Sequence, residues 1–408
     1  MNTQLLNKKI LDIMVGAVLI LFSGNALQTM SSYTTYVALF AALIAFPFVA
    51  FEIMSKKINA MRLAFIVFSL MLMLTAIKEL GTAFLTYLLI GAIMLVAYRI
   101  TRSYTFEEFA NSFLRVMTFV TFVSLICYTL LNTTDIMELL PRVTNVNDVE
   151  YGIGVIFNYI VAVPERNCGM FWEPGIFATF LSIALVIEIA FNKGKISKFR
   201  LVVYAAGIIT ANSTAGFILL LLCAILLLIK NRSDHLLYYI SVGFVVLLLV
   251  LSPFIIYNLD AIISGSFLAD NEYIQKLLSE NLKEQTRLSA FAENIRVFLD
   301  NPFFGNGIAP TEEQSNLVSD TSTSTYLLSA FGILGIFYTV FLLYGIVRQN
   351  KLNTLSKIIL VVIVLFIINK EPHQQIMFTW CFIFYLLKND ELCLNDERRD
   401  GNAQVETA

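Results

Sequence analysis

Long apolar runs alternate with short polar clusters along most of this chain. An α-helix needs about 20 apolar residues to cross the hydrocarbon core of a bilayer, and its own hydrogen bonds satisfy its backbone there. The pattern therefore predicts an all-α fold, a polytopic membrane helical bundle of about 12 transmembrane helices. We expect the helices at residues 10–28, 33–54, 60–77, 82–99, 113–131, 174–191, 200–212, 214–229, 236–256, 322–347, 356–370 and 374–388.

Two long segments interrupt this alternation, at 132–173 and 257–321, whereas the other connections are short. Long loops in compact proteins usually carry function, so we expect the chemistry in them. The apolar stretch 151–163 is too short to span comfortably and is expected to be interfacial or re-entrant. We treat residues 1–388 as one transmembrane helical domain and residues 389–408 as a polar cytoplasmic tail.

Composition agrees with this pattern. Of 408 residues, 58 % are hydrophobic and only 14 % are charged, whereas about 25 % are charged in a typical soluble domain. The formal net charge of −2 gives no reason to expect a nucleic-acid partner. The five cysteines match no metal or redox spacing, and we find no other metal motif, so no metal or disulfide framework is expected.

The basic residues predict the orientation of the bundle. With twelve helices, most of the 28 basic residues fall on the side that holds both termini. The positive-inside rule makes that side cytoplasmic. The external face then carries the others, Lys78, Arg142, Arg166, Lys276, Lys283, Arg287, Arg296 and Lys370.

Arg166 and Glu173 lie in the first external segment, within Pro-Glu-Arg-Asn-Cys-Gly-Met-Phe-Trp-Glu-Pro-Gly at 164–175. Pro174 suits the first turn of a helix, which places Glu173 at the helix N-terminus and at the membrane surface. The helix dipole stabilises an ionised carboxylate there. Two interpretations stay open from these residues: a helix cap beside an arginine that anchors to lipid headgroups, or two members of a catalytic site.

The second external segment carries Arg287 and Arg296. Apolar residues recur with helical spacing through 288–299, which predicts an amphipathic helix. One interpretation is a helix that lies on the bilayer with its arginines on lipid headgroups. The other is a cationic clamp for a phosphorylated ligand, because the guanidinium fork is planar, charged and bidentate.

A third cluster, Lys370-Glu-Pro-His373, forms a short external turn. An isolated loop histidine is more often structural than catalytic. His373 gains interest because the predicted topology places it on the same face as Arg166 and Glu173. Asp12 and Glu188, in contrast, are expected near cytoplasmic helix ends, where they reach water.

Four stretches, in this order along the chain, resemble the sequence motifs of a known protein family. They are Arg-Asn-Cys-Gly-Met-Phe-Trp-Glu-Pro-Gly-Ile-Phe-Ala at 166–178, Thr-Ala-Asn-Ser-Thr-Ala-Gly at 210–216, an arginine with Asn-Pro-Phe-Phe-Gly-Asn-Gly at 287–307, and Phe-Gly-Ile-Leu-Gly at 331–335. Together they resemble Wzy-type O-antigen and capsular polysaccharide polymerases, of the O-antigen polymerase/ligase superfamily. Ligases usually carry a His-Asn pair before the helix that follows the large loop. Here 321–327 is Thr-Ser-Thr-Ser-Thr-Tyr-Leu, which favours the polymerase.

The resemblance implies a metal-independent glycosyltransferase without a cofactor, in the bacterial inner membrane. It implies that a growing glycan passes from undecaprenyl pyrophosphate to a sugar hydroxyl of another lipid-linked repeat unit at the periplasmic face. Membrane lipids and a chain-length regulator protein are the further partners expected. On this basis Glu173 is the expected base, and His373 is the rival base or a phosphate ligand. The pyrophosphate is assigned to Arg166, Arg287, Arg296 and Lys370.

Two other functions stay open from the sequence. An O-antigen ligase would differ in its acceptor, which is lipid A–core. A lipid-linked sugar flippase or other transporter would form no new bond. A transporter is expected to place charged residues near the bilayer midplane, whereas the predicted spans here are almost free of charge.

Overall fold

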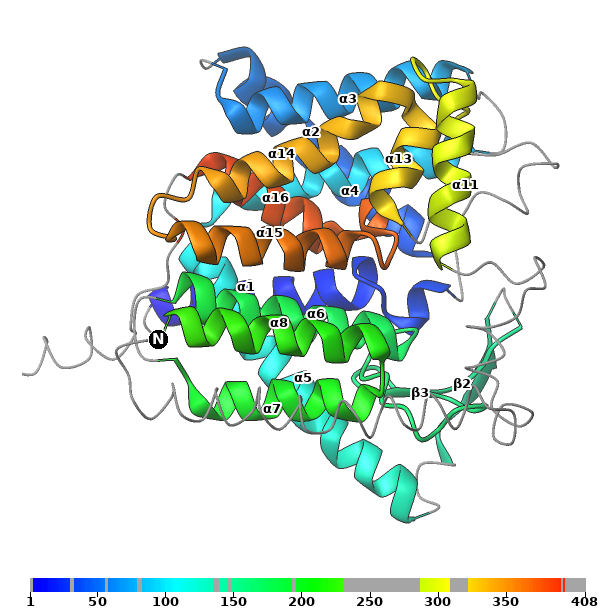
Figure 1. Ribbon diagram of the computed structural model, residues 1–408, viewed down its shortest axis with the longest axis vertical. Coiled ribbons are helices and arrows are strands. Elements are labelled where there is room, and N and C mark those ends of the chain that lie inside the picture. Colours follow the sequence, from blue (N-terminus) through cyan, green and yellow to red (C-terminus); the bar gives the residue numbers. More distant parts are fainter. Residues whose placement is uncertain are drawn as a thin grey trace, which may run out of the picture.

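The computed structural model describes residues 3–29, 33–55, 58–78, 83–134, 139–145, 148–192, 196–230, 287–308, 322–389 and 392. Helix makes up 76 % of it. The helices lie side by side, and three strands and α11 lie at one end, opposite the N-terminus (Figure 1). The elements are α1 (Thr3–Phe22), η1 (Ala26–Thr29), α2 (Tyr33–Ser55), α3 (Ala60–Lys78), α4 (Phe84–Ser103), α5 (Phe106–Thr133), β1 (Arg142–Thr144), β2 (Glu150–Ile153), β3 (Asn158–Ile160), α6 (Pro174–Val186), η3 (Ile187–Phe191), α7 (Lys198–Ala211), α8 (Thr214–Lys230), α11 (Arg287–Asp300), α13 (Thr323–Phe331), η4 (Gly332–Gly335), α14 (Ile336–Val347), α15 (Thr354–Ile368), η5 (His373–Gln375) and α16 (Met377–Lys388).

Every transmembrane helix predicted within these residues is helical, although the boundaries move. The helix expected at 113–131 begins at Phe106, because Thr105 and Glu108 form a capping box. The helix expected at 322–347 is broken at η4. The predicted helix 236–256, the loop residues 257–286 and 309–321, and the tail beyond residue 392 lie outside the described residues.

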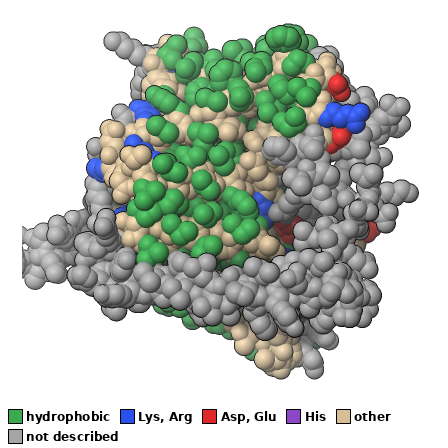
Figure 2. Space-filling view, in the orientation of Figure 1, with side chains coloured by type: hydrophobic (Ala, Val, Ile, Leu, Met, Phe, Trp, Pro, Cys, Tyr) green, Lys and Arg blue, Asp and Glu red, His purple; other side chains and the backbone are tan. Residues whose placement is uncertain are grey.

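Six helices in the described part are long and apolar enough to cross a membrane, and α8, α15 and α16 are shorter apolar helices. Hydrophobic side chains cover the middle of the face in Figure 2, while charged side chains lie near its edges. On α2, Leu43 is 72 % exposed and Phe51 is 75 % exposed. Soluble monomers rarely expose apolar patches this continuous. The structure is consistent with a helical protein embedded in a membrane.

The centre of the bundle is α6, whose residues are all buried, as are those of η3. Phe378 of α16 packs against Phe180 of α6 and against Phe113 of α5, with ring centroids 5.8 and 4.2 Å apart. A helix that is apolar on all sides needs neighbours on all sides. The burial of α6 therefore explains why helices distant in sequence gather around it.

At the end of the bundle that holds the last residues of α4, η3, α8 and α16, here called the basic end, lysines donate to helix C-terminal carbonyls. Lys388 Nζ lies 2.7 Å from the Thr101 carbonyl oxygen. Lys230 Nζ lies 2.6 Å from the Asn192 carbonyl oxygen. Such carbonyls lack a partner within their own helix, and a cation there suits the negative end of the helix dipole. These lysines thus stabilise the ends of neighbouring helices.

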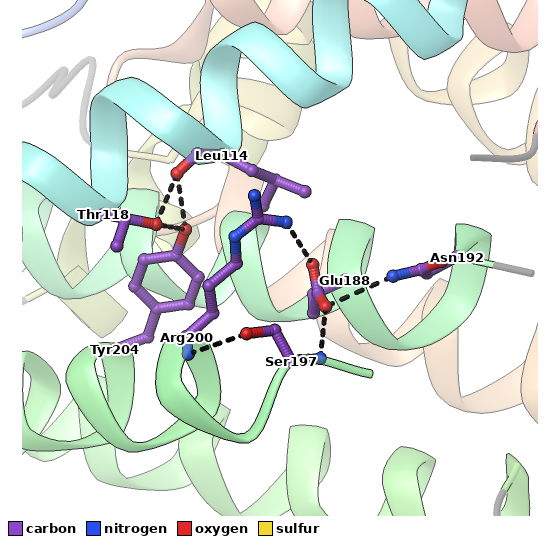
Figure 3. Close-up of polar contacts among 7 residues, drawn as sticks. All are labelled: Leu114, Thr118, Glu188, Asn192, Ser197, Arg200 and Tyr204. Atoms are coloured by element: carbon purple, nitrogen blue, oxygen red, sulfur yellow. Dashed lines mark hydrogen bonds and ion pairs between the residues drawn. The ribbon is translucent and has the colours of Figure 1, made fainter. Parts of the chain in front are cut away.

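The expectation that Glu188 reaches water is wrong. Its side chain is fully buried in η3, a π-helical turn. Glu188 accepts hydrogen bonds from Arg200 Nη1 at 3.1 Å, the Ser197 backbone at 2.7 Å and Asn192 Nδ2 at 3.2 Å (Figure 3). The sequence places Glu188 near a helix end, but the chain that returns into α7 covers that end. The carboxylate is therefore a structural ion pair.

A three-stranded antiparallel sheet, in the order β1-β2-β3, forms part of the first long segment. The expectation of an all-α fold misses this sheet, and part of the stretch 151–163 belongs to β2 and β3. Its interfacial or re-entrant position stays a prediction. The strands are three or four residues long, too short for a periodic signal. Gly152 pairs with Tyr159, and a side chain at Gly152 would collide with the tyrosine ring. The glycine that weakens the pattern in the sequence is thus what lets the hairpin close.

The end of the bundle that holds the sheet and α11, here called the sheet end, contains a second tight contact. The turn after α11 lies against the break between α13 and α14, backbone to backbone. The Ile333 amide donates to the Pro302 carbonyl at 2.7 Å, and the Gly307 amide donates to the Ala330 carbonyl at 2.9 Å. The turn that follows the amphipathic helix is thereby fixed to the bundle.

Gly305 and Gly332 permit this contact. Their φ angles are +63° and +64°, in the region that L side chains rarely adopt. A Cβ on Gly332 would lie 2.5 Å from the Phe303 carbonyl carbon, and one on Gly305 would overlap the Ala330 carbonyl. Both glycines are therefore needed for two reasons, conformation and space.

We expect Gly305→Ala and Gly332→Ala each to destabilise the protein by at least about 2 kcal/mol. Thermal unfolding in detergent measures the effect. The matched control is Gly91→Ala in α4, where the nearest atom to a new Cβ is Leu72 Cδ1 at 3.9 Å. Alanine is the better helix former there, so the control should unfold at or above the wild-type temperature. If all three variants unfold at the same temperature, the contact between the turn after α11 and the break between α13 and α14 does not depend on these glycines.

Candidate active site

The segment from Arg166 to Glu173 is a buried plug at the sheet end. Cys168, Met170 and Phe171 are almost completely buried. The backbone is held from several sides: the Trp172 amide donates to the Gly24 carbonyl at 2.8 Å. Because its interior residues are held in this way, the segment presents Arg166 and Glu173, both partly exposed, at its two ends.

Asn167 fastens the plug to the corner between α7 and α8. Its backbone amide donates to the Thr210 carbonyl at 3.0 Å, and its Nδ2 donates to Thr210 Oγ1 at 3.1 Å. Its Oδ1 accepts from Ser124 Oγ at 2.6 Å. Asn167 is 1 % exposed, so these contacts are shielded from water. One side chain thus fixes the position of Arg166 relative to two other helices.

The Cys168 thiol, in the middle of the plug, is not a nucleophile near neutral pH. Burial raises its pKa to about 12, an effect larger than those of the nearby Arg166 and Glu173 charges. A thiol reacts as its thiolate, which such burial disfavours.

Glu173 is the N-cap residue of α6, as predicted, but its side chain makes no capping hydrogen bond. A Cβ placed on Gly175 would lie 3.1 Å from Glu173 Oε1, 3.0 Å from Lys370 Nζ and 3.2 Å from Glu371 Oε1. Three charged groups from two parts of the chain therefore converge on the first turn of α6. The structure brings together Glu173 and Lys370, which the sequence places 197 positions apart.

Lys370 is 2 % exposed, and its ammonium group donates to the Gly175 carbonyl at 2.6 Å. Glu371 Oε1 lies 3.9 Å from Lys370 Nζ, and Glu371 is 3 % exposed. Burial of a charge is tolerated when the charge is paired and hydrogen-bonded. The turn between α15 and α16 is therefore docked onto the N-terminus of α6 by electrostatics.

His373 is fully buried in the same turn. Its Nδ1 lies 2.8 Å from Thr379 Oγ1, and its backbone amide donates to Thr323 Oγ1 at 2.7 Å. Burial lowers the pKa of the imidazole to about 3; the nearby Ile367 backbone opposes this shift, and the Lys370 charge adds to it. The ring is neutral near pH 7 and accepts a proton poorly. Between the two candidates for the base, this geometry favours Glu173.

The arginines of the second external segment lie on α11. Arg287 is its first residue, and the Arg287 side chain lies outside the described part of the structure. Arg296 is 74 % exposed and lies 3.8 Å from Glu293. The buried Asn294 donates to Thr325 Oγ1 at 3.2 Å and attaches α11 to α13.

Two functional candidates were missed by the sequence reasoning. Glu371 lies beside Lys370 in the sequence, but no spacing rule separates a buried carboxylate from a loop residue. The Thr323 hydroxyl lies 2.7 Å from the Glu371 carbonyl oxygen and 2.9 Å from Gln374 Oε1. It links the start of α13 to the turn, and the serine- and threonine-rich stretch 321–325 was its only signal.

Comparisons with protein-family models, with curated proteins and with solved structures found no match to this chain. The residues at the sheet end are therefore the basis for any assignment of function.

Because the pKa of His373 is low in the folded protein, we expect the stability of the fold to decrease at acidic pH. The unfolded chain binds a proton on this ring below about pH 6.5, whereas the folded protein does so only near pH 3. The stabilisation is fully present above pH 6.5 and is lost as the pH falls toward 3, by about 2 kcal/mol between pH 6.5 and 5. We expect His373→Asn, which can keep a bond to Thr379 without titrating, to lose less thermal stability over this interval. Parallel losses in both proteins would contradict the assignment.

Proposed function

We propose that this protein is a glycosyltransferase that polymerises lipid-linked oligosaccharide repeat units. One observation carries the proposal: the stretches that resemble polymerase blocks contact each other in pairs at one end of an apolar bundle. Asn167 of the first binds Thr210 of the second. The Ile333 amide of the fourth stretch donates a hydrogen bond to the Pro302 carbonyl of the third stretch. Unrelated structural motifs need not meet, whereas parts of one site must lie close together, and each of these contacts joins two of the four stretches.

The chemistry needs three elements. An apolar bundle has to admit polyprenyl chains from the bilayer. Cations have to stabilise the pyrophosphate that leaves with the electron pair of the broken glycosidic bond. A base has to take the proton of the acceptor hydroxyl, whose oxygen forms the new bond to the anomeric carbon.

We assign the base to Glu173, which is partly exposed, and the pyrophosphate to Arg166 and Arg287, with Arg296 as a weaker third. The donor and acceptor are both carried by undecaprenyl pyrophosphate, and the site is periplasmic, with both termini cytoplasmic, in a bacterial inner membrane. The transfer is metal-independent. A chain-length regulator is the expected protein partner.

Purified protein in liposomes, given lipid-linked repeat units without ATP and with a metal chelator, should produce a ladder of lengthened glycans. Gel separation with carbohydrate staining measures it. Glu173→Gln should abolish the ladder while the protein remains folded. Transfer only to added lipid A–core would indicate the ligase instead. Movement of the lipid-linked sugar across the bilayer without new bonds would contradict both enzymes.

The guanidinium fork gives a sharper test. Arg287→Ala should lower the rate by about 10- to 100-fold, because a charge-assisted hydrogen bond is lost in the transition state. Arg287→Lys should still lose about tenfold, since lysine cannot form the bidentate contact. Arg142→Ala is the matched control, because Arg142 is an external arginine that lies 3.8 Å from its own partner, Glu150, on the sheet. Full activity of Arg287→Ala at normal protein level would remove Arg287 from the site.

A further inference from the structure

The charges around the first turn of α6 are divided unequally between what is buried and what is accessible. Lys370 and Glu371 are 2 % and 3 % exposed. Glu173 is partly exposed, so it is the member of the cluster that a substrate can reach. The Lys370 ammonium is already engaged by the Gly175 carbonyl at 2.6 Å and by Glu371 Oε1 at 3.9 Å. A ligand would therefore meet a carboxylate, not an ammonium group.

Gly175 explains how the cluster closes. Its φ angle lies outside the positive region, so its backbone conformation does not require glycine. Space does: an added Cβ would lie 3.0 to 3.2 Å from the Lys370, Glu173 and Glu371 head groups. All three gather around one α-hydrogen, and Lys370 Nζ is no more than about 6 Å from Glu173 Oε1. Opposite charges at such separations attract each other.

The combined charge of Glu173, Glu371 and Lys370 indicates which part of a substrate can bind at this cluster. Two carboxylates surround one ammonium group, and the neighbouring His373 is neutral because burial lowers its pKa to about 3. Pyrophosphate is strongly anionic and would be repelled. A sugar hydroxyl is neutral and donates a hydrogen bond that a carboxylate accepts.

Two further described groups, Arg166 and Tyr151, lie near this cluster. Arg166 is the first residue of the plug and Glu173 is the last, and both charges act on the buried Cys168 thiol. Tyr151 of β2 keeps its proton, because burial raises its pKa and the Glu173 charge raises it further. The described cation that is tied into the first turn of α6 is Lys370.

We propose that Lys370 is a positioning residue that acts through Glu173, and that this cluster receives the acceptor sugar hydroxyl while pyrophosphate binds apart from it, at the arginines. The proposal rests on the proposed function. It changes the role expected for Lys370 from the sequence, which was direct contact with pyrophosphate. Glu173 takes the hydroxyl proton as the new bond forms, and Lys370 transfers no proton. The ammonium group holds the carboxylate and the first turn of α6 in place.

The test compares Lys370→Met and Lys370→Arg in a single-addition assay with a defined lipid-linked acceptor. Lys370→Met should lower kcat at least about tenfold and raise the acceptor KM, because Glu173 loses its fixed neighbour. Its inhibition constant for inorganic pyrophosphate should stay within about twofold of wild type. Lys370→Arg should restore part of kcat, since it keeps the charge. Arg166→Gln should show the opposite pattern, with weaker inhibition by pyrophosphate.

Two further variants separate positioning from general stability. Gly175→Ala leaves Lys370 intact but pushes the head groups apart, and should reproduce the Lys370→Met pattern. Lys388→Met is the matched control, because Lys388 also donates to backbone carbonyls but lies at the other end of α16. If Lys370→Met does not fold, the kinetics of Gly175→Ala alone test whether the cluster positions Glu173. Equal losses in Lys388→Met, or a tenfold weaker inhibition by pyrophosphate in Lys370→Met, would overturn the proposal.

Failure of the proposed function gives a different result. A wild-type protein that forms no ladder would refute the polymerase, but the charge assignment is then still tested by equilibrium binding of radiolabelled inorganic pyrophosphate. Binding by Lys370→Met equal to wild type, with loss in Arg166→Gln, supports the separation of the two subsites. Loss of binding in Lys370→Met overturns it.

Discussion

The arrangement of this protein depends on the burial of α6 together with a charged group at each end of it. Every residue from Pro174 to Phe191 is buried, including Glu188, and the partly exposed Glu173 comes directly before this stretch. An unpaired buried carboxylate costs several kcal/mol, and removing one partner of a buried pair typically costs about 3–5 kcal/mol. The carboxylate at each end of this buried segment therefore requires a cation nearby. Arg200 comes to Glu188, and the turn that carries Lys370 comes to Glu173.

The two ends nevertheless differ in what they can do. Glu188 is closed on all sides by Arg200, Ser197 and Asn192, which makes it a clamp. Glu173 has a buried cation behind it and an accessible side in front. A carboxylate held in place without being fully enclosed suits proton transfer, because preorganisation lowers the cost of orienting the base. The contrast follows from one geometric fact: the basic end of α6 is covered by the chain that returns into α7, whereas its sheet end faces the plug.

The helices could be predicted from the sequence because the apolar runs are long, and because Pro174 marks the start of α6 locally. The capping box at Thr105 was overlooked, so the start of α5 was expected at residue 113 and not at Phe106. The sheet could not, since its strands have at most four residues and Gly152 interrupts their pattern. Glu173 and His373 were both plausible bases in the sequence, and only burial separates them. Glu371 was missed because its importance arises from contact with α6, about 200 residues earlier, and sequence spacing carries no information on such contacts. The roles of Arg287 and Arg296 stay predictions.

The composition of the plug has a physical reason. Between Arg166 and Glu173 the chain must stay rigid, and a loop of polar residues would be solvated and mobile. Apolar residues such as Met170 and Phe171 bury themselves in the bundle, and Asn167 supplies the hydrogen bonds that a buried backbone needs. The two charged residues are left at the ends of a segment whose length is set by packing. Their separation is therefore a property of the core, and a substitution at the buried Phe171 should change the spacing between Arg166 and Glu173.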